Sequence, residues 1–187
     1  MPVTIRAATE DDARAIAEIH VAGWRFAYRG QMPDAFLASL SVDEREKQRR
    51  QWLEKPPTPE HRTWVAEAED GRIAGFAISG PERAELPASG CAEIYAIYVA
   101  PDRIGSGVGR ALFEWSVGDL RKRGFVDVVL WVLDTNERAR RFYEAAGMAA
   151  DGGTKRANFG ERELTEVRYR CRGWRLNPGA APGSQPR

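Results

Sequence analysis

The sequence has few of the residues from which disulfide frameworks and metal centres are built. Its 187 residues include 2 cysteines, Cys91 and Cys171, and 2 histidines, His20 and His61. These residues are scattered and show none of the short spacings typical of metal ligands. The pattern therefore excludes a disulfide-stapled scaffold and indicates no metal site. Both cysteines are interpreted as small residues of core or edge strands.

The sequence also lacks an excess of charge of either sign. Lysine and arginine number 28 and aspartate and glutamate 27, which gives a net charge of +1. This balance provides no attraction to nucleic acid or to a membrane surface, so we expect neither as a partner. No apolar run approaches the ~18 residues of a bilayer span, and the first residues show no basic flank followed by an apolar stretch. We therefore expect a cytoplasmic protein.

What is present is an ordinary globular composition, with 43% hydrophobic and 29% charged residues. This length predicts one domain with a substantial core, which we place at residues 1–174. Residues 175–187 are rich in proline, glycine, alanine and serine and contain no apolar anchor. Such a segment cannot bury enough apolar surface to offset its ordering, so a disordered tail is predicted.

The most informative stretch is a strand, a glycine-rich loop and a helix that follow one another. Glu93–Val99 is rich in β-branched and aromatic residues, and Pro101 ends the strand. Glycines at 105, 107 and 109 come next, and then apolar residues at helical spacing, which are Ala111, Leu112, Trp115 and Leu120. Free N–H groups at a helix start bind anions when no side chain blocks them. The loop is therefore typical of a phosphate site.

Known phosphate loops differ in what accompanies the glycines. A Walker loop needs Lys-Ser/Thr directly after its last glycine, whereas Arg110 follows here. A dinucleotide-binding loop needs a third glycine at the position of Arg110, and it usually opens its domain, whereas about ninety residues precede this strand. If the loop is considered without the rest of the sequence, it could also be a glycine-rich turn that only caps the helix and binds no phosphate.

A second stretch, residues 127–148, repeats the strand-then-helix pattern. Asp127–Leu133 reads as a buried strand, and the following segment has an apolar stripe at helical spacing formed by Ala139, Phe142, Tyr143 and Ala146. Thr135 or Asn136 can cap this helix, and Gly147 can end it in a left-handed conformation.

Together the two stretches resemble motifs A and B of the GNAT superfamily of acyl-CoA-dependent N-acyltransferases. Motif A is Gln/Arg-x-x-Gly-x-Gly/Ala after a strand, and Ile104 here takes the place of its first residue. Motif B is Asn-x-x-Ala-x-x-Phe-Tyr-x-x-x-Gly followed by a large apolar residue. The residues in register with it are Asn136, Ala139, Phe142, Tyr143, Gly147 and Met148.

The resemblance implies an α/β (α+β) fold. Its sheet is mixed but mostly antiparallel, with about seven strands, splayed between the fourth and fifth and flanked by helices. It implies acetyl-CoA as the cofactor, with its pyrophosphate on the backbone of the loop and its pantetheine arm along the fourth strand. The implied cofactor-binding residues are Ile97, Tyr98, Val99, Ile104, Gly105, Ser106, Gly107, Val108, Gly109, Arg110, Asn136 and Tyr143.

The resemblance also suggests which groups perform acetyl transfer. Tyr143 lies near the thioester sulfur in the family and is the candidate general acid, although it could be a core residue only. The N–H of Val99 is the candidate donor to the oxyanion. Glu93 is the candidate base, since strand alternation would place it on the face of Tyr95, Ile97 and Val99; the alternative is a solvated strand-end glutamate. Trp131 stands where other members carry a base, which argues against a ribosomal N-terminal-alanine acetylase.

The acceptor is less well defined by the sequence. The candidate substrate-binding residues are Trp24, Tyr28, Glu93 and Tyr95. We expect a direct transfer to a primary amine of a small molecule. Two alternatives stay open, a protein or peptide acetyltransferase and a non-catalytic acyl-CoA sensor. A homodimer formed through the last strands is a further expectation by analogy.

The remaining elements are predicted from local patterns. Val3–Ala7 reads as a strand, residues 9–30 and 33–53 as helical, and 63–68 with 72–79 as a hairpin turning at Asp70-Gly71. Pro56–Pro59 reads as a stiff linker, and residues 80–90 as a loop that could rim the acceptor site. Two closing strands, 148–154 and 163–171, are predicted to be joined by a connection at 155–162.

Overall fold

The computed structural model describes residues 2–55, 60–84, 90–159 and 162–172. The predicted linker at Pro56–Pro59, most of the predicted loop at 80–90 and the predicted tail at 175–187 lie outside these ranges. Within them, the predicted sheet architecture is confirmed.

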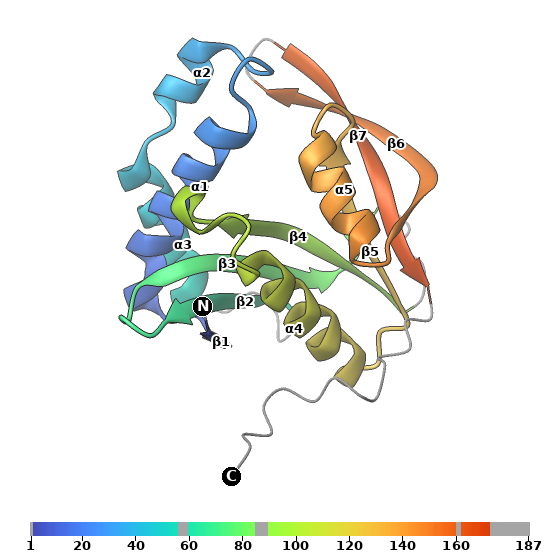
Figure 1. The fold of residues 1–187 in the computed structure, drawn as a ribbon, viewed down its shortest axis with the longest axis horizontal. Helices are drawn as coiled ribbons and strands as arrows, with labels where there is room; N and C mark the ends of the chain where they lie inside the picture. Colours follow the sequence, from blue (N-terminus) through green and yellow to red (C-terminus); the bar gives the residue numbers. More distant parts are fainter. Residues whose placement is uncertain (1, 56–59, 85–89, 160–161, 173–187) are drawn as a thin grey trace.

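A single mixed sheet of 7 strands forms the centre of the molecule, in the order β1-β2-β3-β4-β5-β7-β6. Only β4 and β5 pair in parallel, while every other neighbouring pair is antiparallel. The strands are β1 (Val3–Ala7), β2 (Arg62–Ala68), β3 (Ile73–Pro81), β4 (Cys91–Val99), β5 (Asp127–Leu133), β6 (Ala149–Phe159) and β7 (Arg162–Arg172). Figure 1 shows β4 and β5 diverging from one end of the sheet.

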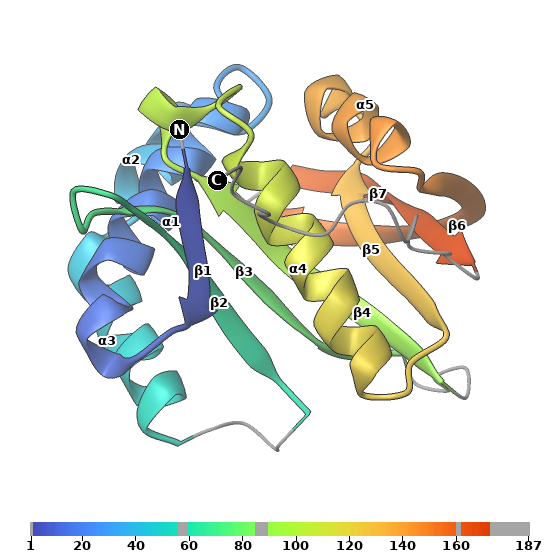
Figure 2. The same cartoon turned by 60° about the horizontal axis from the view of Figure 1, so that its bottom comes forward.

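Helices cover both faces of this sheet. One group consists of α1 (Ala13–Ala27), which packs on β3 and β4, and of α2 (Asp34–Ser39) and α3 (Val42–Glu54), which pack against α1. A short turn η1 (Glu10–Asp12) precedes this group. On the opposite face lie α4 (Val108–Lys122) and α5 (Glu137–Ala145), and η2 (Pro101–Arg103) precedes α4. Figure 2 shows α4 crossing the sheet with α5 beside it. Both groups contact β3 and β4, α1 on one face of the sheet and α4 on the other.

The gap between β4 and β5 arises because these strands pair over only a short length. Residues 91–93 pair with 127–129, and no pairing between the two strands continues past Val129 within the described residues. From Ile94 onward, β4 keeps its antiparallel partner β3, while β5 pairs with β7 up to Leu133. The β5-facing edge of β4 therefore has backbone groups that no strand satisfies, which is an arrangement that can bind an extended ligand.

A bulge in β4 changes which side chains face which layer. Ala96 pairs with Ile78 but Ile94 pairs with Ser79, so Tyr95 is an extra residue in the ladder. Ile94 and Ile97 consequently pack into the same core cluster as Phe113 of α4, although they are three residues apart.

The bulge corrects the predicted orientation of Glu93. Uninterrupted alternation would place Glu93 on the face of Ile97 and Val99. Ile94, the neighbour of Glu93, instead shares the α4 face with Ile97, so Glu93 points to the opposite layer. The sequence pattern contains no signal for the inserted residue.

The last hairpin is longer than predicted. Residues 155–159, predicted as part of a connection, continue β6 and pair with β7, for example Lys155 with Glu166 and Ala157 with Leu164. The sequence pattern did not indicate this part of the strand because the segment is polar, and β6 can be polar because it is the edge strand of the sheet. Gly152, with φ of +86°, lies at the register shift between Ala150 and Thr154.

The predicted apolar face of α4 is partly wrong. Leu112, Phe113, Val117 and Leu120 are buried, whereas Trp115 is 44% exposed. The Trp115 ring instead meets Trp64 of β2 edge-on, with 5.7 Å between ring centroids.

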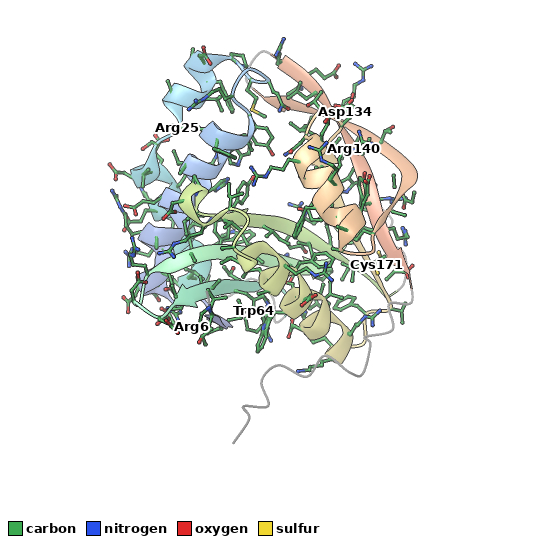
Figure 3. The ribbon with its side chains drawn as sticks, in the orientation of Figure 1. Arg6, Arg25, Trp64, Asp134, Arg140 and Cys171 are labelled. Carbon is green, nitrogen blue, oxygen red and sulfur yellow. The ribbon has the colours of Figure 1, made fainter. Side chains whose placement is uncertain are left out.

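The predicted character of the cysteines is confirmed, because Cys91 and Cys171 are buried and free; Figure 3 labels Cys171 on β7. The described ranges hold no cluster of His, Cys, Asp or Glu side chains arranged for a metal ion. Within the same ranges, no helix combines the length and apolarity needed to cross a membrane.

Candidate active site

A cavity of about 740 Å³ opens between the diverging strands β4 and β5. Its walls are residues 94–99 of β4, the loop around Gly105, the start of α5 and the end of β5, while the C-terminal end of α1 closes one side. This volume is in the range of sites that bury small ligands. The cavity therefore joins the two stretches that carry the sequence motifs.

The glycine loop presents bare backbone to this cavity. Gly105 and Gly107 have φ of +86° and +90°, values that disfavour any residue with a side chain. The N–H groups of residue 105 and of residues 107–110 find no backbone acceptor within the described part of the chain. Unpaired N–H groups at the first turn of α4 attract an anion through the helix dipole. The loop thus fits a diphosphate.

The start of α4 is also held close to β4. A Cβ on Gly109 would lie 3.4 Å from Cγ2 of Val99 and 3.7 Å from the Phe142 ring, so the first turn approaches the end of the strand closely. Arg110, at the cavity wall, donates from Nη1 to the carbonyl oxygen of Ala145 at 3.1 Å. This bond joins the first turn of α4 to the last turn of α5.

The other motif builds the start of α5. Oδ1 of Asn136 accepts from the N–H of Ala139 at 3.1 Å and caps the helix. Arg140 donates from Nη1 to the carbonyl oxygen of Asp134 at 2.9 Å, and Figure 3 labels both residues where β5 passes into α5. Gly147 has φ of +86° and ends the helix as predicted.

The N–H of Val99 is directed toward the cavity. The next residue, Ala100, donates its N–H to the carbonyl oxygen of Ala74, which belongs to β3. Successive N–H groups of a strand point to opposite edges, so that of Val99 points away from β3 and into the gap. This is the orientation that the oxyanion role requires.

Three tyrosines, Tyr28, Tyr98 and Tyr143, line the cavity. The Tyr28 hydroxyl is hydrogen-bonded to the side chains of Tyr98 and Asn136. Tyr143 lies within electrostatic range of both phenols. Burial raises the pKa of Tyr143 above its usual value, and the neighbouring Tyr28 contributes to the rise. Burial likewise raises the pKa values of Tyr28 and Tyr98, so all three hydroxyls stay protonated and can donate at neutral pH.

Most of the predicted cofactor residues lie in the cavity wall. Those present there are Ile97, Tyr98, Val99, Ile104, Gly105, Gly107, Gly109, Arg110, Asn136 and Tyr143. Two are not part of the wall: the Val108 side chain is buried in the core, and Ser106 is exposed, with its hydroxyl donating to the carbonyl oxygen of Arg103 at 2.6 Å.

Glu93 is not brought to the cavity wall. Its carboxylate is buried and paired with Arg83, whose Nη2 lies 2.6 Å from Oε1 and whose backbone N–H donates to Oε2 at 2.9 Å. Tyr95 lines the cavity, but its hydroxyl donates to the carbonyl oxygen of Pro81 at 2.5 Å. The structure therefore separates Glu93 from the reacting groups.

Of the two predicted acceptor aromatics in the first helical segment, only one reaches the cavity. Tyr28 lines it, while Trp24 lies behind, with its ring centroid 5.1 Å from that of Tyr28 and 6.2 Å from that of Phe36. Trp24 thus supports the Tyr28 ring rather than facing the acceptor.

The structure adds wall residues that the sequence pattern did not indicate. Glu166 of β7 lines the cavity beside Gln31, Trp131 and Thr135. Glu166 sits opposite Leu133 in the β5–β7 ladder and opposite Lys155 in the β6–β7 ladder. Only long-range strand register brings it there, so no local motif could have identified it.

Hydrogen bonds between the segment after α1 and the β5–β7 region bridge one end of the cavity. The Arg162 guanidinium donates to the carbonyl oxygen of Gln31 at 2.6 Å, and the Thr135 hydroxyl donates to Oε1 of Gln31 at 2.7 Å. Beside them Leu133 packs in an apolar cluster with Met32 and Leu37. The segment after α1 is therefore fastened to the far half of the sheet.

Comparison with known proteins agrees with this geometry. Residues 13–148 match the model of the acetyltransferase (GNAT) family. The uncharacterized N-acetyltransferase YuaI of Bacillus subtilis is 35% identical over 143 residues, which cover 76% of this chain and 78% of that protein.

Solved structures share the fold at lower sequence identity. The PaiA N-acetyltransferase from Thermoplasma acidophilum, solved with coenzyme A, superposes with a TM-score of 0.74 at 16% identity over 92% of this chain and 99% of that one. The protein yncA from Salmonella typhimurium, solved with its cofactor acetyl-CoA, gives 0.68 at 22% identity over 99% and 100% of the two chains. By its matched motifs, its sequence relatives and its splayed sheet, the chain belongs to the acetyltransferase (GNAT) family.

Proposed function

We propose that the protein transfers the acetyl group of acetyl-CoA directly to a primary amine of a small molecule. The observation that carries this proposal is one continuous cavity with bare N–H groups at the glycine loop and tyrosine hydroxyls between the diverging strands. The loop offers donors suited to a diphosphate, and the unpaired edge of β4 suits an extended amide-containing arm. The neighbours solved with coenzyme A and acetyl-CoA support this choice of donor.

A small acceptor is favoured over a peptide because hydrogen bonds bridge one end of the cavity. Gln31 is hydrogen-bonded to Thr135 and to Arg162, so the segment after α1 and the start of β7 are linked across that end. A peptide substrate would need an open groove at this place. A compact amine needs only the enclosed volume.

The chemistry needs an acceptor amine that has passed its ammonium proton to water, a stabilised oxyanion and a tolerated leaving group. The bound donor supplies a thioester carbonyl that an amine can attack. The Val99 N–H is oriented to donate to the carbonyl oxygen as negative charge develops, a contribution of about 3 kcal/mol for a well-placed donor. The Tyr143 hydroxyl can donate to the departing sulfur. Because its pKa is raised above that of a thiol, we assign it a hydrogen-bonding role with incomplete proton transfer.

Two measurements test the proposal. Titration calorimetry with coenzyme A should show one binding event, and thiol release from acetyl-CoA should be detected with members of a panel of alkylamines, amino acids and short peptides. Release with small amines and not with peptides is the expected result. Tight binding without release on any amine would indicate a sensor instead. Release restricted to peptides would replace the small-molecule acceptor.

A further inference from the structure

We propose that Glu166 and Trp131 form a subsite for an ammonium group of the acceptor, so that the substrate class is cationic alkylamines. This inference rests on the proposed function, because it names the acceptor for the same cavity. The subsite has two parts, a carboxylate and the face of an indole ring, which are the two protein groups that best attract an ammonium ion.

The strand registers place both parts on one face of the sheet. Trp131 pairs with Arg168, and Leu133 pairs with Glu166, so the side chains of these four residues share a face. Leu133 on this face packs against Met32 from the segment after α1. Glu166 and Trp131 therefore lie on the face of the sheet that is directed toward the segment after α1, and both line the cavity.

The chain itself provides an ammonium at this place. Nζ of Lys155 lies 3.2 Å from Oε2 of Glu166 and 4.4 Å from the centre of the Trp131 ring. Lys155 belongs to the edge strand β6, and its side chain is 41% exposed. An ion pair of such exposure is weak, so a substrate ammonium can replace it without a large penalty.

The other charged residues of the cavity wall have different partners. Arg110 is bonded to Glu114 and Ala145 beside the glycine loop, and Glu137 pairs with Arg141 on the outer side of α5. The Arg138 guanidinium lies 5.5 Å from the centre of the Phe26 ring. Glu166 is therefore the wall carboxylate that the sheet contributes, and its charge favours a cation over an anionic acceptor.

Arg168 does not neutralise the subsite. Its guanidinium lies 5.6 Å from the Trp131 ring centre but forms ion pairs with Asp151 at 2.9 Å and Glu82 at 3.4 Å. The two carboxylates balance this cation, which leaves Glu166 with Lys155 as its partner in the described residues.

A binding comparison that requires no transfer tests the subsite. The protein is saturated with coenzyme A, which carries no acetyl group, and phenethylamine or phenethyl alcohol is titrated in by calorimetry. The two probes share a skeleton and differ in the ammonium group. We expect the amine to bind at least ~10-fold more tightly than the alcohol, in line with a charge-assisted contact. Equal affinity, or no binding of the amine, would overturn the subsite.

Two variants test whether Glu166 causes the preference for phenethylamine over phenethyl alcohol. Glu166→Gln should remove most of the preference for the amine while leaving coenzyme A affinity unchanged. Glu163→Gln is the matched control, because Glu163 also lies on β7 and pairs with Arg156 of β6, but outside the cavity wall. A preference that survives Glu166→Gln would refute the assignment. A preference lost equally in Glu163→Gln would refute it as well.

Lys155→Met should strengthen phenethylamine binding, a result that misfolding of the variant could not produce. Removal of the competing ammonium should tighten phenethylamine binding several-fold, and unchanged or weaker binding would count against the competition. Failure of the proposed function is recognised separately, because the protein would then take up no coenzyme A or would release no thiol, whatever the outcome of the probe comparison.

Discussion

Nη2 of Arg83 lies 2.6 Å from Oε1 of Glu93, and the Arg83 backbone N–H donates to the other carboxylate oxygen. Glu93 is 2% exposed, whereas the Arg83 side chain is 56% exposed. The pair thus fastens the segment after β3 to the first part of β4, and both oxygens of Glu93 are engaged. This arrangement favours a structural role for a residue that the sequence pattern suggests as a base.

Glu93→Gln should therefore act on stability more than on chemistry. The amide keeps one acceptor oxygen but loses the charge that holds Arg83, and we expect a loss of about 1–3 kcal/mol in the free energy of unfolding. The pH profile of kcat should keep its shape. Urea denaturation and pH–rate measurements check the two parts. A rate loss concentrated at low pH would restore Glu93 as the base.

Gly107→Val should remove coenzyme A binding by a backbone effect. Gly107 has φ of +90°, and no atom lies within 4 Å of the place that a Cβ would take, so the protein has space for the side chain but not for its backbone conformation. The strain should cost about 1–2 kcal/mol of stability and redirect the N–H groups of the loop.

Gly124→Val is the matched control for this variant. Gly124 follows α4, has φ of +92° and also has no neighbour within 4 Å, but it lies outside the cavity wall. Both variants should lose similar stability, whereas only Gly107→Val should lose affinity in calorimetry. Equal affinities in the two variants would contradict a loop that holds the diphosphate.

Tyr143→Phe should lower turnover without loss of coenzyme A affinity. Removal of the hydroxyl takes away the hydrogen bond to the departing sulfur, and we expect kcat to fall about 10- to 100-fold. Because burial raises the pKa of Tyr143, its hydroxyl remains a donor at alkaline pH, so wild-type kcat should show no fall up to about pH 9 from this group. Steady-state kinetics and calorimetry separate the two quantities. An unchanged kcat would exclude Tyr143 from the chemistry.

Much of the fold could be predicted from the sequence because the residues that start and end helices and strands lie where the structure has those ends. Pro101 and Gly147 end their elements, Asn136 caps α5, and the strand Asp127–Leu133 has the predicted bounds. These features depend on backbone chemistry within a few residues of each position. The conformation of the glycine loop could be predicted for the same reason, since it depends on Gly105, Gly107 and the start of α4.

The acceptor end could not be predicted because it depends on long-range register. Tyr95 is an inserted residue in β4, which reverses the orientation expected for Glu93. Glu166 reaches the cavity only through the pairings of β7 with β5 and β6. One residue of slip in any of these ladders would turn its side chain to the other face. No pattern within β7 reports this register.

His20 should make the stability of the fold depend on pH below neutrality. Its ring packs between those of Tyr98 and Trp24, with centroids at 4.9 and 5.7 Å, and its Nδ1 has no hydrogen-bond partner within the described residues. Burial, with a smaller contribution from the positive charges of Arg49 and Arg45, lowers the pKa of His20 from 6.5 to about 3.

The sign of the effect follows from this depressed pKa. In the unfolded chain His20 takes up a proton near pH 6.5, whereas in the folded chain it stays neutral until the pH approaches its pKa of about 3. The contribution of neutral His20 to folding stability is therefore complete above pH 6.5 and declines as the pH falls toward 3. Between pH 6.5 and pH 5 the loss should be roughly 2 kcal/mol, a window in which ordinary carboxylates remain ionised. His20→Phe should flatten this slope, as measured by urea denaturation at each pH. His61→Gln, which removes the other histidine, should flatten it less, because His61 is less buried than His20. If wild type and His20→Phe lose stability in parallel across this window, the decline originates in another group.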